Sequence, residues 1–306
     1  MKKIVTFTLM MCMALSFTAC NNNGNTSTES TSSENNTPVI TLQEVYEAGK
    51  DYAALLGNHE NVYIVATSNG KVLYETYIGK DYLYSSYDAE YMDIGMNTSS
   101  FITNHSEYSC YDNAYERCVT LSPNGIVNLE DPLALAGQIT FVASVILDDD
   151  YVITEQDGLI IVTCTSNAED IYVDEGVISC AETYTLDAET REMLSVKTVY
   201  TYEDGRTEEG IATITRDVET PEGAKPFLAY EQATENLRTI TIVSNPGAEN
   251  EKTETIQTPK GLTVSLYPDF EIEEPFTMYA DAACTQVMEE GLDVNSDAIV
   301  YVKWGE

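Results

Sequence analysis

A long series of short segments, each bounded by turn residues, constrains the fold of this chain more than any other feature. The candidate strands lie at 61–67, 71–78, 82–87, 91–96, 99–104, 118–121, 151–154, 159–165, 177–186, 193–202 and 210–218. Asn69-Gly70 between the first two strands is a strong hairpin signal, because both residues tolerate a positive φ. The 21 tyrosines, against 7 phenylalanines and 1 tryptophan, also favour strands. The pattern predicts a mainly β protein built on one curved antiparallel sheet, an unclosed barrel.

Two helices are expected to cover the concave side of this sheet. The first covers 42–56 and begins with a capping box formed by Thr41 and Glu44. Its apolar residues recur at helical spacing, and Gly57 suits the position after its end. Asp131-Pro132 predicts the start of a second, shorter helix, with the aspartate as cap and the proline at the first helical position.

The N-terminal 38 residues have the pattern of a leader followed by a tether. Two lysines precede an apolar run at 4–15, which is too short to span a bilayer, since spanning takes about 20 residues. Thr18-Ala19-Cys20 resembles the end of a bacterial lipoprotein signal. The resemblance implies removal of 1–19 and a diacylglyceryl group on Cys20, which would place the protein at the extracytoplasmic face of the membrane. Ordinary secretion with a cut nearby is the alternative.

The segment 20–38 and the charge of the whole chain fit such an arrangement. After Cys20 the segment contains no aliphatic or aromatic residue, so it cannot bury a core and is expected to be a flexible tether. The formal net charge is −36, which repels nucleic-acid phosphates and anionic lipid headgroups. Nucleic acid is therefore not an expected partner, and contact with a membrane requires the covalent lipid.

The order of the expected elements resembles the LolA-like family of bacterial lipoprotein and lipid carriers. The likeness rests on the helix start at Asp131-Pro132 and on the closing pair 186–190 and 202–205, and it defines a domain at 39–232. It implies an open barrel whose hydrophobic cavity takes acyl chains, and another antiparallel barrel or sandwich is the alternative. The residues expected to line such a cavity are Leu55, Leu56, Leu133, Ile139, Tyr82 and Tyr84. Because strand side chains alternate, Tyr82 and Tyr84 can share a face, which Tyr87 cannot join.

The C-terminal part, 237–306, is expected to be a separate small β domain. Between Phe276 and Trp304 it resembles the second half of a Listeria–Bacteroides-type surface repeat, which has a β-grasp-like fold. Positions that match include Tyr279, Asp281 and Tyr301, and the unit occurs once. The alternation within 299–304 predicts an edge or closing strand.

No residue pattern here carries an identifiable chemistry. The two histidines, His59 and His105, lie outside any nucleophile motif, and neither a metal nor a cofactor is expected. Cys110 with Cys118, and Cys164 with Cys180, are each spaced to lie on neighbouring strands. Outside the cytoplasm these pairs are candidate disulfides, with buried free thiols and a zinc site as the alternatives.

Two functional hypotheses follow, and neither involves catalysis. In the first, the protein is a membrane-anchored lipoprotein that binds a hydrophobic or acyl ligand inside the open barrel. In the second, it is a surface interaction module, and its Tyr-rich sheet or its C-terminal β domain contacts another envelope protein or a host surface.

Overall fold

A computed structural model describes residues 40–89, 95–122, 125–127, 151–167, 176–268, 275–288 and 291–305. Its helices are α1 (Leu42–Gly49), α2 (Tyr52–Leu56), the short 3-10 helix η2 (Glu222–Ala224) and α4 (Lys225–Glu231). Among the described residues, no helix is long and apolar enough to cross a membrane.

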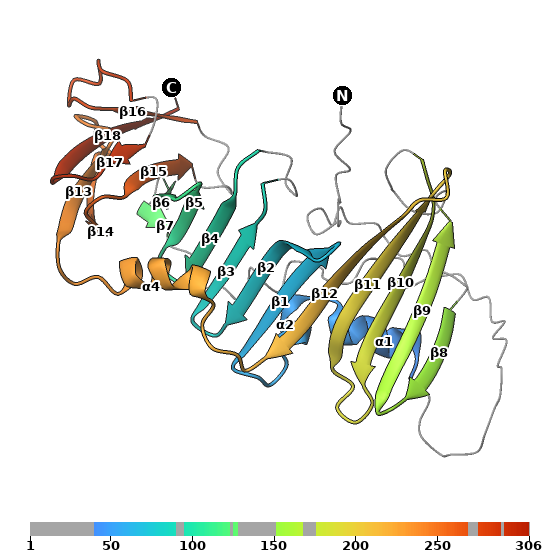
Figure 1. Cartoon of the computed structure of the whole chain (residues 1–306). Coiled ribbons are helices and arrows are strands. Elements are labelled where there is room, and N and C mark those ends of the chain that lie inside the picture. The colour runs from blue at the N-terminus through green and yellow to red at the C-terminus, as the bar shows by residue number, and fades with distance from the viewer. Residues whose placement is uncertain are drawn as a thin grey trace.

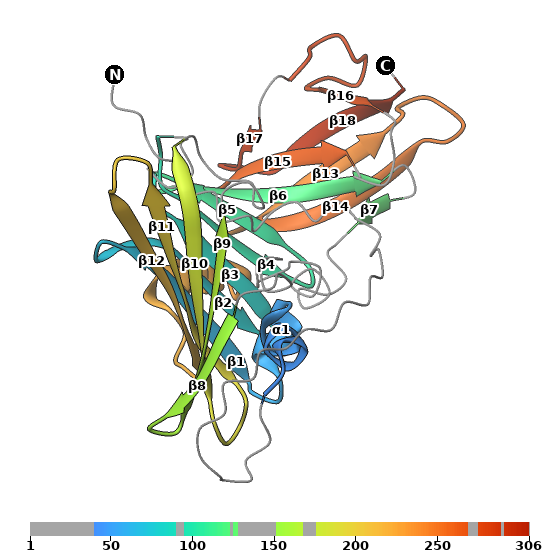
Figure 2. The same cartoon turned by 90° about the vertical axis from the view of Figure 1, so that its right-hand side faces the viewer.

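A 14-stranded sheet dominates the described part of the chain, and it curves around α1 and α2 (Figures 1 and 2). Its strands are β1 (Asn61–Ser68), β2 (Lys71–Gly79), β3 (Tyr82–Tyr87), β4 (Thr98–Thr103), β5 (Glu107–Tyr111), β6 (Ala114–Ser122), β7 (Gly125–Val127), β8 (Tyr151–Gln156), β9 (Leu159–Asn167), β10 (Val177–Asp187), β11 (Met193–Tyr202), β12 (Thr207–Arg216), β15 (Thr263–Pro268) and β17 (Leu292–Asp293). The order runs from β8 through β12 to β1, and then from β1 through β6 to β15 and β17. The expected mainly β architecture, with a curved and unclosed antiparallel sheet, is confirmed.

The expected hairpin at Asn69-Gly70 joins β1 and β2. Both residues have positive φ, 51° at Asn69 and 78° at Gly70, as the tight turn requires. Strand β5 was not predicted, and the expected strand at 118–121 is part of the longer β6. The expected strand at 91–96 and the helix starting at Asp131-Pro132 lie outside the described residues, apart from residues 95 and 96.

The prediction of one continuous helix at 42–56 is wrong, because the structure has two helices there, α1 and α2. The capping box is present, with Thr41 Oγ1 accepting from the Glu44 amide at 3.2 Å. The helix then breaks at Asp51, whose carboxylate accepts from the Ala54 amide at 2.7 Å and so caps α2. An aspartate at an N-cap satisfies an amide that a continuous helix would bond to a backbone carbonyl.

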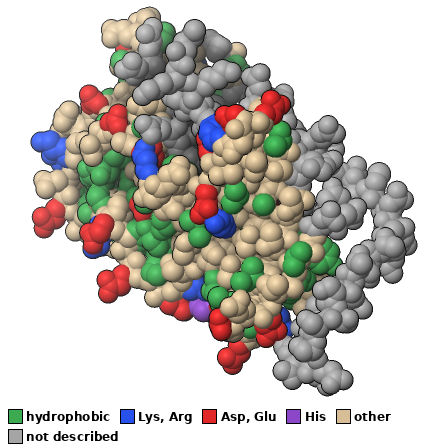
Figure 3. Space-filling model, turned by 45° about the vertical axis from the view of Figure 1, so that its right-hand side comes forward, with side chains coloured by type: hydrophobic (Ala, Val, Ile, Leu, Met, Phe, Trp, Pro, Cys, Tyr) green, Lys and Arg blue, Asp and Glu red, His purple; other side chains and the backbone are tan. Residues whose placement is uncertain are grey.

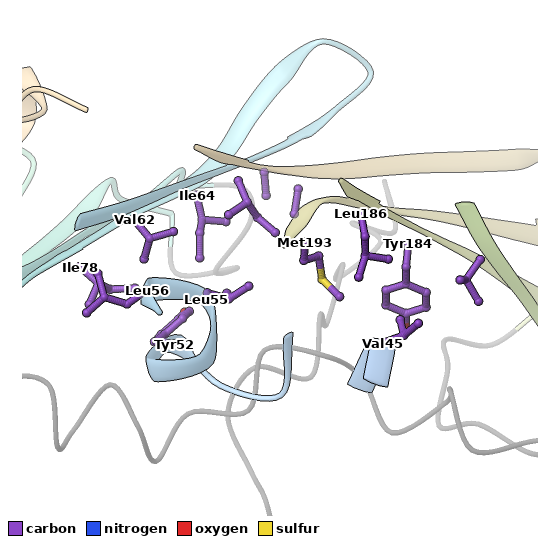
Figure 4. Close-up of a cluster of buried hydrophobic side chains, with 14 of the residues drawn as sticks. Val45, Tyr52, Leu55, Leu56, Val62, Ile64, Ile78, Tyr184, Leu186 and Met193 are labelled. Carbon is purple, nitrogen blue, oxygen red and sulfur yellow. The ribbon is translucent and has the colours of Figure 1, made fainter. Parts of the chain in front are cut away.

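The largest apolar cluster lies between α1, α2 and the inner face of the sheet, the face that carries these two helices. Figure 4 shows Leu55 of α2 on the side of Ile64 and Met193, and Leu56 beside Ile78 of β2. Leu55, Ile64 and Met193 have no solvent-exposed area. This packing joins the two helices to neighbouring strands from the middle of the large sheet.

A second cluster lies on the outer face, beneath η2 and α4. Tyr77, Tyr84, Phe101 and Tyr108 are buried there against Phe227 of α4. The rings of Phe101 and Phe227 are stacked, with centroids 5.6 Å apart and planes inclined by 4°. In Figure 1, α4 lies on the side of the sheet opposite α1 and α2.

The small sheet has four strands, and the C-terminal region also contributes to the large one. Its strands, in spatial order, are β14 (Lys252–Pro259), β13 (Leu237–Ser244), β18 (Ala298–Trp304) and β16 (Phe276–Tyr279). β18 pairs with β13 on one side and β16 on the other, so the edge position expected for 299–304 is wrong. β15 pairs in parallel with β6 of the large sheet, and Val119 of β6 is buried in one cluster with Ile240 and Val300. The division at 232–237 stays a prediction.

Candidate functional site: the faces of the large sheet

The residues predicted to line one cavity lie on opposite faces of the sheet. Leu55 and Leu56 belong to the inner cluster, whereas Tyr82 and Tyr84 belong to the outer cluster under α4. Tyr87 packs against the inner cluster, which confirms that it cannot share a face with Tyr82 and Tyr84. Leu133, Ile139 and the predicted lipidation site Cys20 lie outside the described residues.

The inner face beneath the helices is filled by the protein's own side chains. Leu55 is completely buried and Leu56 is 7% exposed. Both pack on the aliphatic positions of β1 and β2 instead of facing an open space. Full burial of a leucine contributes about 1.5–3 kcal/mol to stability, so moving α2 away to admit a ligand would cost several kcal/mol. These two leucines therefore serve the core.

Polar contacts hold α2 and the loop after it on the sheet. The Arg216 guanidinium donates to the carbonyl oxygens of Leu55 and Met193, at 3.0 Å each. His59 lies between two carboxylates, with Nδ1 2.7 Å from Asp217 Oδ2 and Nε2 2.7 Å from Glu192 Oε1. The hydrogen bonds that His59 makes to Asp217 and Glu192 raise its pKa, because both carboxylates favour the imidazolium. The cluster joins the start of β1, the β10–β11 turn and the end of β12.

The outer face over β2–β5 is also closed, by an aromatic layer with its own hydrogen bonds. Glu75 accepts from the hydroxyls of Tyr63 and Tyr84, the latter at 3.0 Å. Tyr108 donates to Glu231 of α4 at 2.9 Å, and burial raises its pKa to about 12. Tyr84 packs near Phe227 of α4, and Tyr82 stacks on Tyr77 and Phe101 in the same layer. The cavity role expected for these two tyrosines stays a prediction.

The outer face over β9–β12 and β1 carries no helix in the described part of the chain. The strand registers align two rows of five residues across it, one being Ile161, Thr185, Ser195, Thr213 and Val65, and the other Thr163, Thr183, Lys197, Ile211 and Thr67. All ten are partly or fully exposed. We call these two rows the open face.

The open face itself has little charge, but carboxylates flank it, since Glu75 lies opposite Val65 and Glu209 lies opposite Val199. Lys197 is the one charged residue in the two rows, and it pairs with the neighbouring Glu209 at 2.7 Å. In Figure 3, hydrophobic side chains and tan atoms make up most of the described surface, with acidic and basic side chains among them. Threonine dominates, and the hydroxyls of Thr163 and Thr183 are 3.4 Å apart.

Sequence reasoning missed the open face, although the sequence contains its signal. In β9, β10 and β12, threonines alternate with large buried residues, for example Thr183 and Thr185 around Tyr184. Such alternation marks a strand with one buried face. The uncharged character of the other face in so acidic a chain is the additional sign.

The four cysteines predicted to form disulfides are free thiols, and the strand registers explain why. Cys164 lies opposite Glu182, and Cys180 lies opposite Ser166, so the two thiols are diagonal neighbours. Cys118 lies opposite Glu107, and Cys110 lies opposite Tyr115, which sends Cys110 and Cys118 to opposite faces of the sheet. Burial raises the pKa of Cys118 and Cys164 to about 11 and that of Cys180 to about 12.

The titratable groups of the described residues form no metal site. No group of three or more histidine, cysteine, aspartate or glutamate side chains in that part of the chain is placed to hold a metal ion. Among the described residues, the most deeply buried carboxyl group is that of Glu182, which is 6% exposed and accepts from the Tyr184 hydroxyl. Burial raises the pKa of Glu182.

No family model matches the sequence, and no curated protein matches it either. Among solved structures, the chain is similar to an uncharacterized conserved protein of Thermus thermophilus, at 10% identity and a TM-score of 0.28 over 60% of this chain and 90% of that one. It is also similar to MucB in complex with MucA(peri), at 12% identity and a TM-score of 0.23 over 60% of this chain and 56% of that one. The MucA/MucB complex of Pseudomonas aeruginosa gives 12% identity and a TM-score of 0.21 over 71% of this chain and 74% of that one. Because these identities and TM-scores are low, the LolA-like fold stays an expectation from the sequence.

Proposed function

We propose that this chain is a non-enzymatic extracytoplasmic lipoprotein, anchored through Cys20, that works by contact with a protein partner through its open face. The observation that carries the proposal is a contrast between two surfaces of the large sheet. The inner face packs against α1 and α2, whereas no described element covers the open face over β9–β12 and β1. Leu55 and Leu56, which were predicted to contact an acyl chain, are buried in the core. Partly exposed apolar and hydroxyl side chains on the outer surface of a sheet suit protein contact.

The anchor and the charge of the chain support the same proposal. A body with a net charge of −36 is repelled by anionic headgroups, so the acyl chains on Cys20 would hold it at the membrane surface. The tether at 20–38 would then leave the folded part free to orient its open face toward a partner. The LolA-like fold implied by the sequence resemblance is compatible with this role, with the sheet supplying the contact surface.

Site-specific photo-crosslinking in intact cells tests the proposal. A benzophenone amino acid replaces Thr213 on the open face or, as the matched control, Thr255 on β14; both are exposed threonines in strands. We expect a discrete protein adduct from position 213 and none from position 255. An adduct from position 255 alone would move the contact surface to the C-terminal sheet and contradict the proposal.

Acyl-ligand binding is the competing function, and a direct measurement separates it. Lipids extracted from the purified full-length protein are quantified by mass spectrometry, apart from the acyl groups bound covalently to Cys20. We expect no stoichiometric non-covalent lipid, because the described apolar side chains of the inner face pack against one another. One lipid per chain, together with no adduct from position 213, would overturn the proposal in favour of ligand carriage.

A further inference from the structure

We propose that His59 acts as a pH-sensitive link between two segments that are far apart in the chain. While its imidazole ring is protonated, His59 ties the turn between β10 and β11 to the loop between α2 and β1. When the ring is neutral, it releases the turn. This link does not depend on the contact proposed for the open face.

The geometry around the ring of His59 requires two donors. Nδ1 lies 2.7 Å from Asp217 Oδ2, and Nε2 lies 2.7 Å from Glu192 Oε1. An ionised carboxylate can only accept hydrogen bonds, and an imidazole donates from both nitrogens only when it is protonated. A neutral ring would turn one lone pair toward a carboxylate oxygen at hydrogen-bonding distance. One of the two contacts must therefore open when the proton leaves.

Asp217 is the partner that stays in place. Its Oδ1 atom accepts from the Glu60 amide at 2.9 Å, and its own amide donates to the Asn61 carbonyl oxygen at 3.1 Å. Glu192 is held less firmly, because its side chain is 35% exposed and its second oxygen, Oε2, lies 4.0 Å from Nε of Arg216. Loss of the ring proton therefore opens the contact with Glu192, and Arg216 offers that carboxylate a second partner.

The turn keeps its own shape when this contact opens. The Arg191 amide donates to the Asp187 carbonyl oxygen at 3.0 Å. The Asp187 carboxylate accepts from the amides of Glu189 at 2.9 Å and Thr190 at 2.8 Å. None of these bonds involves the ring of His59. What changes with the ring proton is therefore the attachment of the turn to the loop.

His59 is the group of this cluster whose charge changes near neutral pH. The other charged residues on the three joined segments, besides its two partners, are Glu60, Asp187, Glu189, Arg191 and Arg216. Histidine is the side chain that ordinarily titrates between about pH 5 and 8, whereas carboxylates and guanidinium groups do not. The two carboxylates raise the pKa of His59. The link is therefore complete at mildly acidic pH and is lost as the pH rises through the raised pKa.

Amide hydrogen exchange of the purified full-length protein, followed by mass spectrometry, tests this link. Wild type and Glu192→Gln are compared at the same pH, once mildly acidic and once alkaline, so that the intrinsic pH dependence of exchange cancels. At acidic pH we expect Glu192→Gln to exchange about two- to fivefold faster at 57–60 and 187–192, as for loss of one partly exposed ion pair. At alkaline pH we expect no difference, because the wild-type link is already open.

Two matched comparisons make the test specific. Glu189→Gln removes the same charge from an exposed position of the same turn, and it is expected to exchange like wild type at both pH values. In a His59→Gln background, Glu192→Gln is expected to have no further effect at either pH, because the link is already absent. The thermal unfolding midpoints of all variants verify their folding.

Three results would overturn the link. The first is an equal effect of Glu192→Gln at the two pH values, which would show that Glu192 acts without the ring proton. The second is the absence of any effect at acidic pH. The third is a full effect of Glu192→Gln in the His59→Gln background, which would assign the role of Glu192 to its contact with Arg216.

Discussion

The outer face of the large sheet has two halves, which differ in the size of their outward side chains and in whether a helix covers them. Over β2–β5 the outward positions carry large rings such as Tyr84 and Phe101, and η2 and α4 cover them. Over β9–β12 and β1 the outward positions carry threonine, isoleucine and valine, and no described element covers them. Rings of that size lose too much free energy when left in water, whereas a threonine tolerates it. Side-chain size therefore separates the half that stabilises the fold from the half that is available for contact.

The inner face shows why the open half needs no cover of its own. Behind it, Ile64, Tyr184 and Met193 are fully buried under α1 and α2, so these strands have a complete core on one side. An antiparallel sheet commonly packs on one face and meets solvent with the other. Substitutions on the open face are therefore expected to change stability little, so natural selection can adjust these residues for binding to a partner.

The largest predicted effect comes from truncating a ring in the covered half. Phe227→Ala is expected to lower the free energy of unfolding by about 3–5 kcal/mol, because it leaves a cavity between α4 and Phe101. The matched change on the open half, Ile211→Ala, is expected to cost about 1 kcal/mol or less, since that side chain is partly exposed. Urea unfolding followed by circular dichroism measures both. Equal losses would mean that the two halves are equally buried and would break the comparison.

A smaller effect is predicted where η2 approaches the sheet most closely. A Cβ atom on Gly223 would lie 2.0 Å from the Tyr84 hydroxyl oxygen and 2.8 Å from its ring carbon, and the Tyr84 ring is buried and cannot swing away. Gly223→Ala is therefore expected to cost about 1–3 kcal/mol through overpacking. Adding Tyr84→Phe removes the nearest atom and is expected to recover part of the loss. If the double variant is no more stable than Gly223→Ala alone, the clash is not the cause.

The smallest effect concerns the pH dependence of the cluster that holds the loop after α2. The pKa of His59 is raised, first by Asp217 and then by Glu192, so its stabilising contribution is complete below its unfolded value of about 6.5. The contribution is lost as pH rises through the folded pKa. The pKa of Asp217 is lowered, chiefly by its hydrogen bond with His59, so the Asp217 carboxylate stays ionised while His59 is charged. Arg216 keeps its charge throughout this range.

Thermal unfolding of wild type and His59→Gln at a series of pH values tests this assignment. Wild type is expected to be the more stable at mildly acidic pH, with the difference shrinking toward alkaline pH. A difference that is constant across pH would show that His59 contributes through packing and not through its charge.

The sequence predicted local structure better than it predicted which residues meet. Capping at Thr41 and the turn at Asn69-Gly70 depend on neighbouring residues and can be read directly. Alternation shows that Tyr82 and Tyr84 share a face, but it does not say which face of the sheet Leu55 covers, because that depends on how a distant helix docks. The pairing of β15 with β6 joins segments far apart in the chain and has no local signal. α4 is a short helix without a side-chain cap, so its position depends on Phe227 entering the aromatic layer.

The open face is expected to be a covered contact surface in the membrane and a free one in dilute solution. The most direct measurement is maleimide labelling of Thr213→Cys, in a background with Cys118→Ser and Cys284→Ser because both thiols are partly exposed, on intact membranes and on the purified, diluted protein. Position 213 is expected to be protected in membranes and reactive after dilution, whereas Thr255→Cys is expected to react equally in both. Equal labelling of position 213 in both preparations would contradict the proposed contact.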